Sequence, residues 1–230
     1  MFGERVLVIA AHPDDEVLGC GGLLAKLTRN GVICRVVYMG EGSSSRFSNI
    51  GKESDLILAA INERRQCADN ALAILGVVDK HFYELPCGRF DMTSILDIGK
   101  IIEHEIENFM PDTVIAHSGK DLNNDHRLVF QATLQATRPG AKNMVNLLLA
   151  YEVLSSSEWR FVEQFQPNVF IDIEHQLDMK IQAMAAYPAE QKSYPFPRSK
   201  DGIKALAMIR GMQSALCFAE AYEIIRLISR

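Results

Sequence analysis

The stretch that decides the fold reads Val6-Leu7-Val8-Ile9-Ala10-Ala11-His12-Pro13-Asp14-Asp15-Glu16. Its first part, residues 6–9, is apolar throughout, which is typical of a central parallel strand buried on both faces. A histidine and three carboxylates follow within five residues, where that strand ends. Carboxylates this close repel one another and lose solvation on burial, so a fold tolerates them most readily when a cation offsets their charge. The stretch therefore predicts a buried strand that leads into a metal site.

Extended and helical segments alternate along the rest of the chain. The periodicity of apolar residues predicts strands at 5–11, 33–39, 81–85, 113–116, 147–151 and 169–173, and helices at 16–30, 55–75, 93–109, 125–137, 177–186 and 202–218. This alternation predicts an α/β fold: a Rossmann-like open, mostly parallel sheet with helices on both faces. Because the sequence contains no repeat, linker or low-complexity tract, we expect a single domain over residues 1–230.

The composition excludes several classes of protein. With 230 residues, 48% hydrophobic and 23% charged, the chain can bury a sizeable core and is typical of a soluble globular protein. A net charge of -5 argues against a partner such as nucleic acid or an anionic membrane, since either requires a basic face. No run reaches the length of a membrane span, so no membrane insertion is expected. The five cysteines form no CxxC pair and the first residues do not resemble a signal peptide, so we expect a cytoplasmic location.

A second polar cluster, His117-Ser118-Gly119-Lys120-Asp121-Leu122-Asn123-Asn124-Asp125-His126, follows another predicted strand. In open α/β sheets, sites form outside the carboxyl ends of the strands, and both clusters fall at such ends. Zinc hydrolases commonly use two histidines and one carboxylate, which leaves a position open for water. His12, Asp15 and His126 can supply this set and leave Asp14 free as a general base. The spacing alone does not choose between Asp14 and Asp15.

The first motif, residues 11–16 followed by Gly19, Gly21 and Gly22, together with Asp125-His126-Arg127, resembles the PIG-L/LmbE-like deacetylases. Further segments resemble a bacterial subgroup often linked to surface-polysaccharide or amino-sugar biosynthesis: 75–77, 89–91, 137–139, 151–156 and 194–199. The resemblance covers nearly the whole chain. It implies a zinc-dependent hydrolase that removes the acetyl group from an N-acetylglucosamine-type saccharide, nucleotide-sugar or glycoconjugate. The expected partner is therefore a small amino-sugar substrate, and family members often form homo-oligomers.

The resemblance also implies roles for individual residues. His12, Asp15 and His126 would bind Zn²⁺, and Asp14 would be the base that takes a proton from the attacking water. Zinc would lower the pKa of that water towards roughly 7 and polarise the amide carbonyl. The same three ligands would also accept other divalent ions such as Fe²⁺ or Co²⁺.

The chain departs from the family pattern at Asn123. Many members carry His-x-Asp-His at the second motif, where the first histidine assists at the oxyanion. An amide can donate a hydrogen bond but cannot titrate as an acid, so this role is either weaker here or moved to another residue. We expect His117, at the end of its strand, to be the replacement, with Asp125 orienting it as a His117–Asp125 pair.

Three residues are candidates for substrate contacts. Arg64 and Arg65 lie in the predicted helix 55–75, where relatives carry an arginine that contacts the sugar or its phosphate. A guanidinium suits hydroxyls and phosphates because its donors form a fixed fork. Asp91 is a candidate for contact with a sugar hydroxyl.

Two other functions use the same residues. His12-x-Asp14 with a distant His126 also matches the two-histidine, one-carboxylate triad of non-haem Fe(II) oxygenases. Those sites usually lie in antiparallel double-sheet barrels, whereas this chain alternates strands and helices. Asn123 could instead mark a catalytically inactive metal-binding relative. The presence of Asp14 argues against that reading, because a purely structural zinc needs no free base.

Overall fold

The computed structural model of the protein describes residues 1–47, 55–142 and 144–229. Within them, seven strands form one sheet in the order β3-β2-β1-β4-β5-β7-β6. The strands are β1 (Arg5–Ala10), β2 (Ile33–Gly40), β3 (Asp79–Leu85), β4 (Thr113–His117), β5 (Leu147–Tyr151), β6 (Val169–Asp172) and β7 (Ala219–Leu227). β7 is antiparallel to both of its neighbours, and the other pairings are parallel. The predicted α/β class with a mostly parallel sheet is confirmed.

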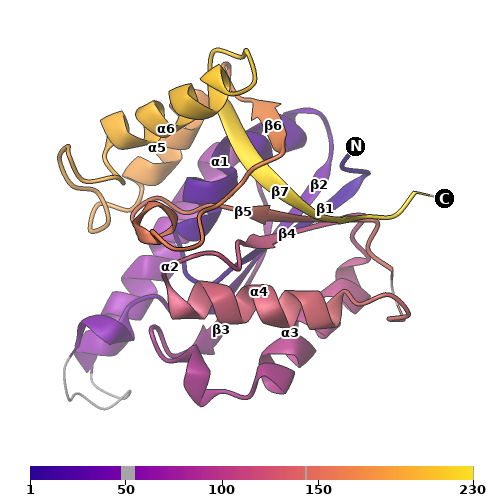
Figure 1. Cartoon of the computed structure of the whole chain (residues 1–230). Coiled ribbons are helices and arrows are strands. Elements are labelled where there is room, and N and C mark those ends of the chain that lie inside the picture. Colours follow the sequence, from indigo (N-terminus) through magenta and orange to yellow (C-terminus); the bar gives the residue numbers. More distant parts are fainter. Residues whose placement is uncertain (48–54, 143, 230) are drawn as a thin grey trace.

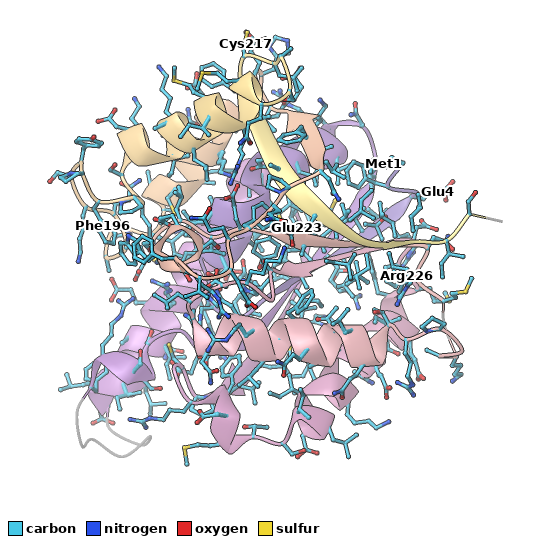
Figure 2. All side chains as sticks on the ribbon, in the orientation of Figure 1. Met1, Glu4, Phe196, Cys217, Glu223 and Arg226 are labelled. Atoms are coloured by element: carbon cyan, nitrogen blue, oxygen red, sulfur yellow. The ribbon has the colours of Figure 1, made fainter. Side chains whose placement is uncertain are left out.

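Helices cover both faces of this sheet (Figure 1). They are α1 (Asp15–Arg29), α2 (Asp55–Leu75), α3 (Ile95–Phe109), α4 (Asn124–Ala136), α5 (Leu177–Ala185) and α6 (Lys200–Met212), with 3-10 turns η1 (Ser44–Arg46), η2 (Phe90–Met92) and η3 (Ser157–Trp159). Helices α1, α2, α5 and α6 share one apolar core, and α3 and α4 share the other. Successive side chains of β1 alternate between these two cores, and Figure 2 shows the side chains filling both layers. No described helix is both long and apolar enough to cross a membrane.

The chain order of the strands reverses direction between β1 and β4. From β1 the chain continues to β2 and β3 on one side, whereas β4 and β5 lie on the other. The helices that follow β1 and β4 therefore begin beside one another, on opposite faces of the sheet. Ligands of open α/β sheets bind at this position, outside the carboxyl ends of the strands. The topology thus brings the two polar clusters of the sequence to one place.

The C-terminal strand was not predicted. The helix expected over 202–218 ends at Met212, and residues 219–227 form β7 between β5 and β6. β7 is held in the sheet partly through the buried carboxylate of Glu220. This carboxylate accepts hydrogen bonds from the backbone N–H groups of Gly22 and Leu23. It also pairs with Lys180 Nζ at 2.7 Å. These partners lie far away in the sequence, so a local pattern does not reveal that Glu220 can be buried in a strand.

Candidate active site

Three donor side chains converge beyond the carboxyl ends of β1 and β4. His12 and Asp15 follow β1, His126 lies in the first turn of α4, and one ligand atom of each lies within 4.8 Å of the others. All three are buried. Asp15 Oδ2 is 3.6 Å from His12 Nδ1 and 3.4 Å from His126 Nε2. Two imidazoles and a carboxylate in this arrangement fit a zinc-type divalent ion, so the residues present suit the metal that the sequence predicts.

Asp15 has the electrostatic surroundings of a charged ligand. Burial acts to raise the pKa of Asp15, but His126 and His117 outweigh this effect and hold that pKa well below its ordinary value. The carboxylate also accepts a hydrogen bond from the backbone N–H of His12 at 2.8 Å. Asp15 is therefore a preformed anion at the centre of the cluster.

His12 is held from behind by a second carboxylate. Its Nε2 lies 2.9 Å from Asp125 Oδ2. Asp125 also accepts hydrogen bonds from the backbone N–H groups of Gly88, at 2.6 Å, and Phe90, at 3.1 Å. A carboxylate on the far nitrogen fixes the orientation of a metal-binding imidazole and makes it more basic. This contact leaves Nδ1 of His12 as the nitrogen that faces Asp15.

His126 also has a carboxylate near its other nitrogen, that of Asp121, which no sequence pattern indicates. Its Nδ1 lies 3.3 Å from Asp121 Oδ1. Hydroxyl groups of Ser156 and Ser157 donate to the same buried carboxylate. Burial acts to raise the pKa of Asp121, but its interactions with His126 and the two serines lower that pKa to about 2. Both candidate ligand histidines are therefore backed by charged carboxylates.

The predicted His117–Asp125 pair is not formed. Asp125 contacts His12 instead, because the first turn of α4 directs its carboxylate towards the backbone that follows β3. His117 is fully buried, and its Nε2 accepts the backbone N–H of Ala11 at 2.8 Å. The same nitrogen is 3.0 Å from the hydroxyl of Tyr151. Burial lowers the pKa of His117 to about 4, so this imidazole is neutral near pH 7.

Asp14 has an unusual backbone and a tightly held side chain. Its φ of 119° lies in the left-handed region, which a non-glycine residue adopts at a cost of roughly 1–3 kcal/mol. Its backbone N–H donates to Glu16 Oε2 at 2.9 Å, which helps to hold this conformation. Its Oδ2 is 2.5 Å from Arg198 Nη1 and 3.1 Å from Arg64 Nη2. Burial raises the pKa of Asp14 even though both guanidiniums oppose that rise.

A C-terminal segment completes the surroundings of Asp14. Glu190, in the loop after α5, pairs with Arg198 at 3.0 Å and also with Arg64 and Arg46. In the sequence, Arg198 falls in the segment 194–199, for which no functional role is predicted. Arg198 and Asp14 are 184 positions apart, so only the folded chain reveals this contact.

The structure separates the other candidate residues. Arg64 lies beside Asp14, but Arg65 points elsewhere and pairs with Glu84 at the surface, at 2.7 Å. Asp91 is exposed on η2, next to Phe90, whose ring centroid is 5.5 Å from that of His12. Asn123 is the N-cap of α4, and its Oδ1 accepts the backbone N–H of Asp125 at 2.9 Å.

The fold and site define an α/β protein with a candidate two-histidine, one-aspartate metal centre at the crossover of its sheet. Residues 7–137, more than half of the chain, match the family model described as PIG-L, GlcNAc-PI de-N-acetylase. The chain therefore belongs to the PIG-L family, and the resemblance inferred from the sequence motifs is confirmed.

Two curated relatives carry deacetylase names. The diacetylchitobiose deacetylase of Thermococcus kodakarensis is 25% identical over 96% of this chain and 83% of its own length. The uncharacterized deacetylase YaiS of Escherichia coli is 30% identical over 75% of this chain and 84% of its own length.

Solved structures share the fold over nearly the whole chain. The N,N'-diacetylchitobiose deacetylase of Pyrococcus horikoshii has a TM-score of 0.78 at 20% identity, covering 96% of this chain and 84% of that one. GalB, the 4-carboxy-2-hydroxymuconate hydratase of Pseudomonas putida, has a TM-score of 0.75 at 23% identity, covering 99% of each chain. Because proteins named for two different reactions share this fold, the fold alone does not assign the reaction.

Proposed function

We propose that this protein is a metal-dependent deacetylase that hydrolyses the acetamido group of an N-acetylated amino sugar and releases acetate. The observation that carries the proposal is the convergence of His12, Asp15 and His126, with the buried carboxylate of Asp14 next to Asp15 in the chain and under its electrostatic influence. Asp14 binds both guanidiniums through Oδ2, so in the described contacts Oδ1 is the oxygen left to handle a proton. The family description and the names of both curated relatives support the same class of reaction.

The reaction requires a water molecule, a base and stabilisation of negative charge. When held by His12, Asp15 and His126, a zinc ion would polarise the amide carbonyl and acidify water. Asp14 takes the proton of the water that attacks the carbonyl carbon. As the C–N bond breaks, the same carboxylate passes this proton to the leaving nitrogen, giving acetate and the free amine. The raised pKa of Asp14, caused by its burial, suits a base that must hold a proton between these two steps.

Asn123 and His117 are the candidates for stabilising the oxyanion. Asn123 uses Oδ1 to cap α4, so Nδ2 is the group with which it would donate a hydrogen bond to the developing charge. For His117, Nε2 accepts the N–H of Ala11, so the neutral imidazole carries its proton on Nδ1, and Nδ1 is the group with which it would donate to the oxyanion. The variant His117→Gln distinguishes the two candidates. If its kcat with metal bound equals that of the wild type, His117 does not stabilise the oxyanion.

An acetate-release screen tests the proposal. The metal-loaded protein is incubated with N-acetylated free saccharides, nucleotide-sugars and lipid-linked sugars, beside Asp14→Asn and the control Asp69→Asn, whose partly exposed carboxylate on α2 pairs with Lys80 at 2.8 Å. We expect acetate from one of these classes, a near-complete loss in Asp14→Asn, and no change in the control. Activity surviving in Asp14→Asn contradicts the assignment of the base, and no acetate from any class contradicts the proposed reaction. Oxygen uptake by the Fe²⁺-loaded protein would favour the oxygenase alternative.

A further inference from the structure

A second group of metal-ligating side chains lies on the other side of His12. One atom each of His12, Cys87 and Asp125 lie within 4.8 Å of one another. The three residues come from the loop after β1, the loop after β3 and the first turn of α4. Since Nδ1 of His12 faces Asp15 and Nε2 faces Asp125, the imidazole stands between this second group and the candidate catalytic centre.

Backbone contacts hold the second group in place. The N–H of Cys87 donates to Glu41 Oε1 at 2.8 Å, and the N–H of the next residue, Gly88, donates to Asp125 at 2.6 Å. The thiol of Cys87 lies 3.2 Å from the hydroxyl of Ser45 and is half-buried. These contacts fix the loop after β3 against α4, so the thiol is held near the imidazole and the carboxylate.

The donor chemistry selects a thiophilic divalent ion. Thiolate, imidazole and carboxylate are all ligands of zinc, with bond lengths of about 2.0–2.3 Å. A thiolate favours zinc and its heavier analogue cadmium over magnesium, calcium or manganese. The donors need to rearrange slightly, because His12 Nε2 and Asp125 Oδ2 are now 2.9 Å apart and share a hydrogen bond.

We propose that His12, Cys87 and Asp125 form a second, inhibitory site for zinc or a similar thiophilic ion. Binding releases two protons, one from the thiol of Cys87 and one from Nε2 of His12. The incoming ion takes the place of the Nε2 proton and of the hydrogen bond to Asp125 that orients His12. Drawing Nε2 into the coordination of the second ion moves the ring out of the position in which Nδ1 faces Asp15, so excess zinc inhibits. This site goes beyond the proposed function, and its occupancy is measurable without catalysis.

Metal stoichiometry and thiolate absorption test the proposal directly. The metal-free protein is titrated with Zn²⁺ and separately with Cd²⁺, and bound metal is counted by elemental analysis after gel filtration. Cadmium also reports thiolate ligation through a charge-transfer band in the ultraviolet. The variants are Cys87→Ser and the control Cys217→Ser, whose exposed thiol lies in the loop between α6 and β7, at the top of Figure 2. Thermal unfolding of the metal-free variants verifies that each is folded.

We expect two ions per chain in the wild type and in Cys217→Ser, but one in Cys87→Ser, with the charge-transfer band lost only in Cys87→Ser. In activity assays, half-inhibition of Cys87→Ser should need at least about ten-fold more zinc than the wild type. A single ion in the wild type, a band that persists in Cys87→Ser, or a band lost in Cys217→Ser instead would overturn the second site. Equal inhibition of the wild type and Cys87→Ser by zinc would overturn its inhibitory role.

Discussion

Replacing Asp121 by asparagine should weaken metal binding without removing any metal ligand. Asp121 Oδ1 lies 3.3 Å from His126 Nδ1, and the pKa of about 2 means that the carboxylate is charged at every working pH. An asparagine has nearly the same shape. With its oxygen in the place of Oδ1 it keeps the contacts with the N–H of Asn123 and the hydroxyl of Ser156, and its amide group in the place of Oδ2 can donate to the hydroxyl of Ser157. The change therefore removes mainly the negative charge behind His126.

The size of the effect follows from that lost charge. Removing the partner of a metal-binding histidine typically costs 10- to 100-fold in metal affinity, which is about 1.4–2.8 kcal/mol. Metal dissociation constants are measured by competition with a chromophoric chelator, and kcat is measured at saturating metal. The control Asp79→Asn removes a carboxylate that pairs with Arg35 on β2, outside the cluster of metal donors. An affinity within two-fold of the wild type, or a loss confined to kcat at saturating metal, would refute the reasoning.

Three further changes test other parts of the structure. A methyl group at Gly19 would lie 2.1 Å from Cδ2 of the buried Tyr151, so Gly19→Ala should lower the free energy of unfolding by about 1–3 kcal/mol; a more stable variant in denaturant unfolding would contradict this packing. Arg64→Ala should reduce kcat/KM about 100-fold, because Arg64 holds Asp14 in position. Arg65→Ala removes only a surface ion pair and should leave kcat/KM unchanged. Equal losses for the two variants in steady-state assays would contradict this difference in role. Burial acts to raise the pKa of Glu105 on α3, but hydrogen bonds with Tyr83 and His81 outweigh this effect and lower that pKa. The contribution of the charged carboxylate to the free energy of unfolding is therefore present above the ordinary pKa of 4.5, and it is lost as the pH falls through the lowered pKa. The difference in unfolding free energy between wild type and Glu105→Gln should therefore shrink below that pH, and a constant difference would disprove the linkage.

The sequence predicts those parts of the site whose residues are close in the chain or follow a strand. His12, Asp15 and His126 could be placed together because β1 and β4 were recognised and the carboxyl ends of parallel strands share one edge. Arg198 and Glu190 could not, because they meet Asp14 through loops after α5 whose course has no local signal.

Where contacts with residues far away in the chain determine how a side chain or segment is oriented, the sequence-based prediction is wrong. Asp125 was expected to face His117, but the N–H groups of Gly88 and Phe90 fix its carboxylate beside His12. The helix expected over 202–218 ends at Met212, and no strand is expected at 219–227, because nothing nearby in the sequence indicates that Lys180 and the backbone of α1 hold Glu220 there. In both cases the deciding partner is more than 30 positions away.

The position of β7 has a consequence for the order in which the sheet can be assembled during synthesis. β6 is made before β7, but its place in the sheet is beside β7, not beside β5. On the ribosome, β1 to β5 can pair as soon as each has emerged, whereas β6 must wait for a strand that is translated roughly fifty residues later. Lys180 remains without its buried partner Glu220 over the same interval. A nascent chain that stalls before β7 would therefore expose one edge of β5 to pairing with other chains.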